Sequence, residues 1–255
     1  MTNAIVVTIE DGIQKLKINR PEKKNALTQA MYAVLAKSLR DADQNPEIRV
    51  SLITGTEDSF TSGNDIMDFI QNPASGDDAP VVQFLYALAE IQKPLIAAVN
   101  GLAIGIGTTM LLHCDLVYAS ENASFALPFV NLALVPEAAS SFLLPRMLGH
   151  PRAAELLLLG ENFSAEAALD AGIVNAVTSP DQVEKTAMAA ALKLSKKAPE
   201  AVRLTKALMK GNSDQVKTVM QTELQAFGSR LTSPEAMEAM QAFMERRPPD
   251  FSKFS

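Results

Sequence analysis

The longest stretch without a charged side chain constrains the fold of this chain more than any other segment, and it runs from Pro94 to Cys114. An uncharged stretch of this length could cross a bilayer as a helix. Asn100-Gly101 interrupts it, however, and Gly105 and Gly107 follow closely. Glycine clustered in this way marks turns. We therefore interpret the stretch as a buried strand, a turn and the start of a buried helix, and we expect no membrane span.

Strand and helix patterns alternate through the first half of the chain. Two β-branched runs, 5–9 and 13–18, flank Asp11-Gly12, a dipeptide typical of hairpin turns. The spacing of apolar residues then predicts helices over 25–42, 81–91 and 106–113, strands over 50–54, 95–99 and 115–119, and loops over 55–65 and 72–78. Strands that alternate with helices indicate an α/β domain with crossover connections.

The remainder of the chain, from residue 136 onward, has mainly helical periodicity. Its last part, about 180–244, is rich in Ala, Leu, Met, Glu and Lys, which are good helix formers. Such helices either pack back on the core or mediate association of subunits. Their apolar side chains are more typical of packing than of a cofactor site: Leu208, Met209, Met220, Leu224, Phe227, Met237, Met240 and Phe243.

Charge and cysteine content exclude several classes of protein. The formal net charge is −6 and no Lys/Arg-rich run is present, which argues against binding of nucleic acid. Cys114 is the single cysteine, so an intrachain disulfide is excluded and a reducing compartment is indicated. Together with His113 and His150 it gives too few ligands for a His/Cys metal site. The first residues lack the basic and long apolar regions of a signal peptide, and we expect a cytoplasmic protein.

Two segments, 60–65 and 100–107, combine glycine with uncharged polar side chains between apolar elements. In such segments a backbone amide can be aimed at a ligand, although each could also be an ordinary turn. Gly105-Ile106-Gly107 starts a pattern like that of dinucleotide-binding loops. Met110 stands where the third glycine is required, so the match fails.

These segments, taken in order, resemble the signature of the crotonase (enoyl-CoA hydratase/isomerase) family. The resemblance begins with Asn19-Arg20-Pro21, Asn25-Ala26-Leu27, Phe60-Thr61-Ser62-Gly63-Asn64-Asp65, Lys93-Pro94, Ala98-Val99-Asn100-Gly101, Cys114-Asp115-Leu116 and Tyr118-Ala119. It continues with Leu148-Gly149, Ala153, Leu159-Gly160, Ala167-Ala168 and Ala171-Gly172-Ile173-Val174-Asn175. The motifs cover nearly the whole chain, which makes the resemblance far more specific than any one of them.

The resemblance implies an α/β fold with a spiral core of ββα units, here residues 1–195, and a C-terminal helical oligomerisation region, residues 196–255. It implies a homotrimer or hexamer, an acyl-CoA thioester as substrate, and no metal and no cofactor, since coenzyme A is part of the substrate. It also implies an oxyanion hole made by the backbone N–H groups of Asn64 and Ile106. Fixed amide dipoles in a dry pocket stabilise the negative charge that develops on a thioester oxygen. The amide of Ile106 would lie at a helix start, where the dipole favours an anion.

Residues around the two loops are implied, by position, to bind coenzyme A or substrate. They are Arg20, Lys23, Lys24, Ala26, Ser62, Gly63, Asp65, Ile66 and Gly105. The three basic side chains could equally be solvated surface charges. Asp65 is typical of a helix cap or loop anchor, Asp115 of a structural acid, and His113 of a hydrogen-bonded core histidine.

The catalytic acids of the family's hydratases are missing: Thr109 and Phe129 stand at their two positions, which argues against two-carboxylate addition of water. In residues 134–141 the chain instead resembles the Δ3,Δ2-enoyl-CoA isomerases, whose catalytic glutamate matches Glu137. Glu137 could also be an ordinary first-turn helix glutamate after proline. Its small and apolar neighbours would raise the pKa of a carboxylate toward a useful value.

A single carboxylate suffices for an isomerase, because moving a double bond takes a proton from C2 and returns one at C4. We therefore predict an acyl-CoA isomerase with Glu137 as the proton shuttle. Alternatives are another reaction of the family, such as isomerisation of a dienoyl- or ring-bearing acyl-CoA, and a non-catalytic CoA-ester-binding subunit.

Overall fold

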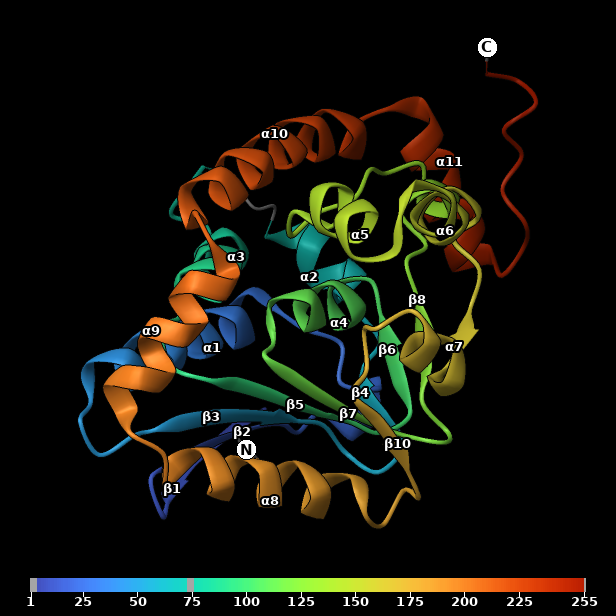
Figure 1. The fold of residues 1–255 in the computed structure, drawn as a ribbon. Coiled ribbons are helices and arrows are strands. Elements are labelled where there is room, and N and C mark those ends of the chain that lie inside the picture. The colour runs from blue at the N-terminus through green and yellow to red at the C-terminus, as the bar shows by residue number, and fades with distance from the viewer. Residues whose placement is uncertain (1–3, 73–75, 255) are drawn as a thin grey trace.

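The computed structural model describes residues 4–72 and 76–254, and their backbone forms two sheets (Figure 1). The larger sheet has the order β1-β2-β3-β5-β7-β10, with an antiparallel β1–β2 hairpin and parallel pairing from β2 onward. Its strands are β1 (Ile5–Glu10), β2 (Ile13–Ile18), β3 (Val50–Thr54), β5 (Leu95–Val99), β7 (Leu116–Ser120) and β10 (Ala176–Thr178). The smaller sheet has the order β4-β6-β8-β9: β4 (Ser59–Thr61), β6 (Leu102–Ile104), β8 (Ser124–Ala126) and β9 (Phe163–Ser164).

The chain visits the two sheets in turn, which makes the fold a spiral. β3 is followed by β4, β5 by β6, and β7 by β8, and helices carry the chain back to the large sheet after each pair. The helices of the spiral are α1 (Gln29–Gln44), α2 (Ile66–Gln71), α3 (Pro80–Glu90), α4 (Ile106–Thr109), α5 (Ser140–Leu148), α6 (His150–Ala154) and α7 (Ala165–Asp170). The predicted α/β fold with ββα units is confirmed.

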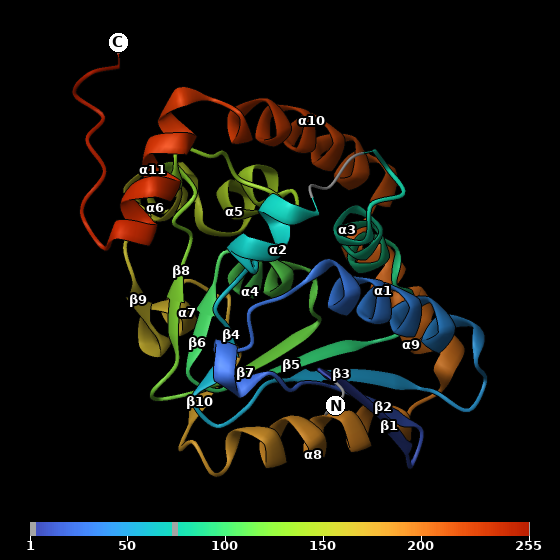
Figure 2. The ribbon, with the colours of Figure 1, turned by 180° about the vertical axis from the view of Figure 1, so that it is seen from behind.

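The central strands are buried on both faces, as in most parallel sheets. Successive side chains of a strand point to opposite faces. Leu52 and Ile96 therefore pack beneath the sheet with α8 (Val183–Ser195), whereas Ile53 and Ala97 belong to the main core above it. Figures 1 and 2 show α8 alone below the large sheet and the other helices above.

Three helices follow α8: α9 (Pro199–Lys210), α10 (Ser213–Leu231) and α11 (Pro234–Glu245). The Nζ atom of Lys206 on α9 donates 2.7 Å hydrogen bonds to the Lys93 carbonyl and to Asp115 Oδ2. α10 crosses the top of the molecule and contacts α3 (Figures 1 and 2). The C-terminal helices thus pack back on the chain's own core, while a separate role in association stays a prediction.

The structure differs from the expected elements in its short strands and in one helix start. Residues 55–65, expected as a loop, contain β4, and residues beyond 136, expected as helix, contain β9 and β10. Strands of two or three residues are too short to show a period of two. The expected helix at 25–42 begins at Gln29, because Thr28 accepts a hydrogen bond from the Met31 N–H as its N-cap and Asn25 has a φ of 58°. Of the expected loop 72–78, residues 73–75 lie outside the described part.

The uncharged stretch 94–114 forms β5, β6, α4 and the 3₁₀ helix η2 (Met110–His113), so a strand, a turn and a helix start are all present. β6 was not expected. Among the described residues, no helix combines the length and the apolar character needed to span a bilayer.

Candidate active site

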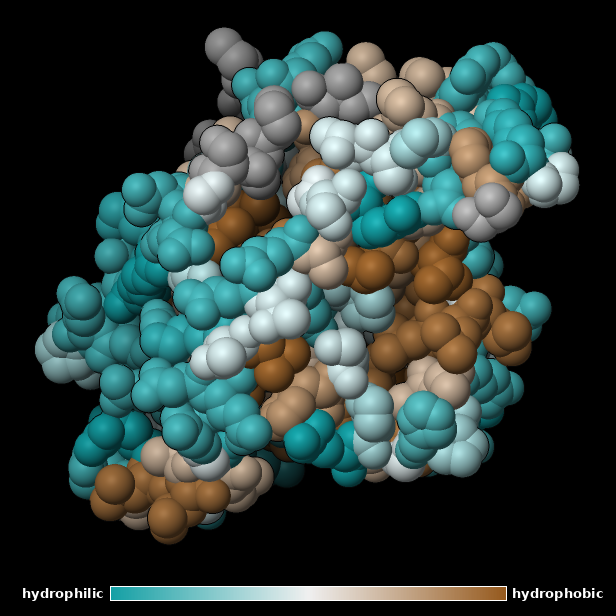
Figure 3. All heavy atoms as spheres, turned by 90° about the horizontal axis from the view of Figure 1, so that it is seen from above, coloured by the Kyte–Doolittle hydropathy of each residue, from teal (hydrophilic) through white to brown (hydrophobic). Residues whose placement is uncertain are grey.

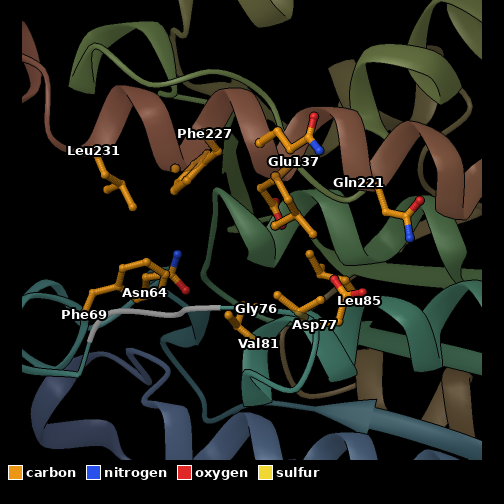
Figure 4. Close-up of a pocket in the computed structure, with 14 residues that line it drawn as sticks. Asn64, Phe69, Gly76, Asp77, Val81, Leu85, Glu137, Gln221, Phe227 and Leu231 are labelled. Atoms are coloured by element: carbon orange, nitrogen blue, oxygen red, sulfur yellow. The ribbon is translucent and has the colours of Figure 1, made fainter.

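A pocket of about 470 Å³ lies between α10 and the segment from α2 to α3 (Figure 4). Seven of its fourteen lining residues have large apolar side chains, and polar groups come from Asn64, Glu137, Asp77, Gln221 and Gln225. An apolar cavity with a few convergent polar groups is the usual form of a small-molecule site. Besides Asn64 and Glu137, its lining residues are Gln221, Leu224, Gln225, Phe227, Gly228 and Leu231 from α10, and Phe69, Gly76, Asp77, Val81, Val82 and Leu85 opposite them.

Two backbone amides are free to bind a ligand: that of Asn64, which lines the pocket, and that of Ile106, which is not among the lining residues but lies on the loop packed against the Asn64 loop. Within residues 4–72 and 76–254, no acceptor is assigned to the N–H of Asn64 or of Ile106. The neighbouring groups are paired: the Gly63 carbonyl accepts from the Leu27 N–H, and the Gly105 N–H donates to the Ala126 carbonyl. Buried N–H groups without a partner are rare in proteins, so these two amides are candidates for an anion site.

Glycine brings the two loops together. Gly105 has φ 57° and ψ −117°, a conformation that strongly favours a residue without a Cβ, and the turn delivers Ile106 as the first residue of α4. A Cβ on Gly107 would lie 2.7 Å from Thr61 Cγ2 and 3.0 Å from the Thr61 carbonyl oxygen. Only glycine therefore lets α4 approach the strand that leads into Asn64 so closely.

Glu137 is the buried acid of the pocket, with 7% of its surface exposed. Its Oε1 accepts a 2.5 Å hydrogen bond from the hydroxyl of Thr109 on α4. Burial raises the pKa of Glu137 to about 8; the Thr109 hydrogen bond opposes this rise and the charge of Glu223 adds to it. Figure 4 shows the Glu137 side chain pointing into the cavity. A carboxyl group with such a pKa can both accept and return a proton near neutral pH.

The backbone turns sharply just after Glu137. Ala138 and Ala139 have φ values of 58° and 57°, in the left-handed region that costs alanine about 1–2 kcal/mol per residue. His113 Nε2 donates to the Ala138 carbonyl at 2.8 Å, and the Ser140 hydroxyl donates to the Glu137 carbonyl at 2.7 Å. Burial lowers the pKa of His113 to about 3, which keeps the imidazole neutral. The expectation of a hydrogen-bonded core histidine is confirmed.

A second buried acid, Glu223 on α10, contacts the same turn. Its carboxylate accepts hydrogen bonds from the Ala139 N–H at 2.6 Å, from the Ser141 N–H at 3.1 Å and from the Ser141 hydroxyl. These groups lie at the start of α5, whose first N–H groups have no partner within the helix. α10 thus forms one wall of the pocket and also binds the segment that carries Glu137.

The Asn64 side chain is held by Tyr32 of α1, whose hydroxyl donates a hydrogen bond to Asn64 Oδ1. Burial raises the pKa of Tyr32 well above its ordinary value, and the charge of Glu137 adds to the rise, so the phenol stays protonated and remains a donor. The contact fixes the loop that carries the unpaired Asn64 amide.

Of the predicted site residues, Asn64 and Glu137 line the pocket. Arg20 Nη1 donates to Asp65 Oδ2 at 2.7 Å and to the Ala26 carbonyl at 2.9 Å. Asp65 Oδ1 in turn caps α2 at the N–H groups of Met67 and Asp68. The expected role of Asp65 as a helix cap is confirmed, and its pKa is lowered by the Arg20 side chain and these backbone donors, against the effect of burial.

The remaining predicted binding residues lie around the same loops. Lys23 and Lys24 are exposed, and Lys24 Nζ lies 2.6 Å from Asp58 Oδ2. The Ser62 N–H donates to the Lys24 carbonyl, and Ile66 is the first residue of α2. Whether these residues bind coenzyme A stays a prediction.

Asp115, expected to be structural, accepts hydrogen bonds at 2.7 Å from the Leu95 N–H and from Lys206 Nζ, which confirms that expectation. In the part of the chain that the structure describes, no three His, Cys, Asp or Glu side chains gather as metal ligands.

Sequence reasoning missed Thr109 as a partner of Glu137, and it missed the contribution of α10. Thr109 was considered only because it stands where the family's hydratases have a catalytic acid. Glu223 could have been found, because it lies at helical spacing among Met220, Leu224 and Phe227, and a charged residue on an apolar helix face calls for a buried partner.

Comparison with known proteins gives a family match over nearly the whole chain. The family model described as enoyl-CoA hydratase/isomerase matches residues 8–253. The chain is 35% identical to enoyl-CoA delta isomerase 2 of Rattus norvegicus, over 97% of this chain and 65% of the rat protein. It is 34% identical to 1,2-epoxyphenylacetyl-CoA isomerase of Escherichia coli (strain K12), over 99% of both chains. Hydratases are similar as well: 2,3-dehydroadipyl-CoA hydratase of the same strain is 33% identical over 97% of this chain and 98% of that protein.

Solved structures agree with this match. A structure of Pseudomonas aeruginosa OdaA is 50% identical with a TM-score of 0.93, and the match covers 96% of this chain and 100% of that one. An enoyl-CoA hydratase/isomerase from Pseudoalteromonas atlantica T6c is 42% identical with a TM-score of 0.93, over 98% and 100% of the two chains.

Proposed function

Since this chain belongs to the enoyl-CoA hydratase/isomerase family, also called the crotonase family, we propose that it shifts the double bond of an unsaturated acyl-CoA from Δ3 to Δ2. One observation carries the proposal: Glu137 is a buried carboxyl group with a pKa raised to about 8, in the pocket that Asn64 also lines. The position of one hydratase acid, Thr109, is occupied by a hydroxyl that donates to this carboxylate.

The reaction balances with one carboxylate and no other reactant. The thioester oxygen accepts hydrogen bonds from the N–H groups of Asn64 and Ile106, which acidify the C2 proton. Glu137 takes that proton, and the electron pair spreads through C2, C3 and C4 as a dienolate. The protonated Glu137 then returns the proton at C4, so that the C3–C4 double bond is lost and a C2–C3 double bond is formed.

The apolar side chains of the pocket suit the acyl chain, and coenzyme A remains outside as the carrier. In this proposal Arg20, Lys23 and Lys24 lie on the side of the nucleotide phosphates, which basic side chains bind well. No metal or redox cofactor takes part, because amide dipoles stabilise the dienolate oxygen. A cytoplasmic homotrimer or hexamer completes the proposal.

A second candidate is isomerisation of a ring-bearing acyl-CoA. It is favoured by the Escherichia coli relative named as an epoxyphenylacetyl-CoA isomerase, which aligns over 99% of both chains. Both candidates use one acid and differ in the acyl group that the pocket accepts.

Turnover of 3-hexenoyl-CoA, followed as the appearance of conjugated enoyl absorbance, tests the proposal. We expect turnover of this substrate and marginal addition of water to crotonyl-CoA, because Thr109 and Phe129 leave hydration without its two acids. Hydration at rates comparable to isomerisation would refute the isomerase assignment. A protein that only binds acyl-CoA would gain thermal stability with the ligand and turn nothing over.

A further inference from the structure

We propose that Glu223 on α10 is a positioning residue for the Glu137 carboxyl group, acting through the left-handed turn at residues 138 and 139. The effect that this inference predicts on turnover rests on the proposed function. The contacts that motivate it, and one of its tests, do not depend on any reaction.

The position of Glu223 is unusual for an acid. Only 7% of the residue is exposed, and within residues 4–72 and 76–254 no Lys, Arg or His nitrogen lies within 4 Å of its carboxylate. Its partners are the Ala139 N–H, the Ser141 N–H and the Ser141 hydroxyl. A buried carboxylate is retained only where such donors offset its lost hydration. All three donors belong to the segment that follows Glu137.

That segment needs an external support. Left-handed alanines persist where the surroundings fix them, and two follow one another here. His113 holds the carbonyl of the first, and Glu223 holds the N–H of the second. Glu223 thus fixes the side of the turn that leads into α5. With the turn released, the chain after Glu137 relaxes and the carboxyl group loses its fixed direction into the pocket.

The same helix carries part of the pocket wall. In Figure 4, Gln221, Phe227 and Leu231 lie on α10 and reach the cavity from the side opposite Phe69 and Val81. Glu223 lies two residues after Gln221 and four before Phe227. One helix therefore determines both the shape of the acyl cavity and the location of the base, so the two cannot shift independently.

The charge of Glu223 also affects the pKa of Glu137. The Glu223 charge is one of the causes that raise the pKa of Glu137, together with burial, while Thr109 lowers it. The titratable groups facing the Glu137 side chain from the packed elements are Tyr32 of α1 and Glu223 of α10, and Asp77 lines the same pocket. Replacing Glu223 by a neutral side chain should therefore lower the pKa of Glu137 while loosening its position.

The test compares Glu223→Gln, Ser141→Ala and the control Asp214→Asn. Glu223→Gln keeps the size of the side chain but leaves one acceptor oxygen where two now accept. Ser141→Ala removes one donor and leaves the Glu223 charge. Asp214→Asn removes an acid from the same helix at a side chain that is 80% exposed. Turnover is measured at about pH 9, above the Glu137 pKa, so that the base is ionised in every variant.

For Glu223→Gln we expect kcat to fall by about 10- to 100-fold with KM within about 2-fold, the scale of a displaced catalytic group. Ser141→Ala should reduce kcat by a smaller factor, and Asp214→Asn should not change it. Titration of the Glu137 side chain by carboxyl-carbon NMR without substrate, assigned with Glu137→Gln, should give a lower pKa in Glu223→Gln and an unchanged one in Ser141→Ala.

A folded Glu223→Gln protein with wild-type kcat and an unchanged Glu137 titration would overturn the proposal, even with lowered thermal stability. Failure of the proposed function has a different signature. The wild-type protein would then turn over no acyl-CoA isomer, while the NMR titration would still respond to Glu223.

Discussion

At the scale of single residues, the proposed reaction depends on one carboxyl group, that of Glu137, whose pKa differs from that of an ordinary glutamate. The sequence pointed to Glu137 through the resemblance to the isomerases and through its apolar neighbours; the structure places this residue in the pocket, and its role as the base stays a prediction. The hydrogen bond from Thr109 to Glu137 could not be predicted from the sequence, since a contact between residues 28 positions apart has no local signal. The remaining site contacts come from chain segments that only the fold brings together.

Glu137 should make stability depend on pH. Its pKa rises from 4.5 to about 8 on folding, so the folded state binds more protons than the unfolded state between these values. The stability that Glu137 contributes in its protonated form is therefore present below about pH 4.5 and lost as pH rises toward 8. Glu137→Gln should gain Tm relative to the wild type as pH rises across this range, by about 2–4 °C for each kcal/mol relieved. Calorimetry at several pH values would contradict this if the Tm difference were constant.

Thr109→Val should shift the pH profile of activity. The Thr109 hydroxyl stabilises the ionised Glu137, so removing it while keeping the side-chain shape raises the pKa of Glu137 further. The rising limb of kcat/KM should move to higher pH, and activity at pH 7 should fall by about 3- to 10-fold for a shift of roughly 0.5–1 unit. An unchanged profile in the folded variant would exclude a functional role for this hydroxyl.

At the scale of elements, prediction from sequence was good for long strands and helices and poor for short ones. β3 and β5 are apolar, β-rich runs, and they were located to the residue. β6, β8 and β9 have two or three residues each and exist because neighbouring strands pair with them. α10 was recognised as a helix, but its place over the pocket depends on non-local contacts such as that of Glu223.

The docking of α9 can be tested through its buried lysine. Lys206 is 6% exposed, and its Nζ pairs with Asp115, the residue just before β7 of the large sheet. Lys206→Met keeps much of the side chain but leaves Asp115 without its cation, which should lower the free energy of unfolding by about 3–5 kcal/mol. Lys217→Met, which breaks the more exposed pair with Glu90, should cost less than about 1 kcal/mol. Equal effects in urea unfolding would show that α9 is not anchored by this pair.

At the scale of the whole molecule, hydrophobic surface is distributed unevenly. Seen from above, it gathers on the right of Figure 3, the side where Figure 1 places α6 and α11, and in a second patch at the lower left, the side where Figure 1 places α9. Large apolar side chains are exposed on α11, including Phe243 at 61%, on the π-helix Glu155–Leu159 that follows α6, including Leu158 at 67%, and on α9, where Leu208 is 85% exposed. Contiguous apolar surface on a soluble protein is typical of association.

We therefore expect a trimer or hexamer in solution. Light scattering at micromolar concentration should give three or six times the chain mass. Phe243→Ser should shift the distribution toward smaller species, and Val34→Ser, a single exposed apolar residue on α1, should not. A monomeric wild-type protein under these conditions would contradict the prediction and the assigned role of residues 196–255.

Glu137→Gln is the sharpest test of whether Glu137 carries the proton. Gln keeps the size but cannot take a proton from C2, so kcat for 3-hexenoyl-CoA should fall by ~10²-fold or more while acyl-CoA binding persists. Glu161→Gln, at an exposed glutamate, is the matched control and should behave as wild type. The alternative role, a glutamate in the first turn of a helix, is not open to Glu137, because α5 begins at Ser140 and has no acidic residue in its first turn. Wild-type kcat in a folded Glu137→Gln protein would contradict the account.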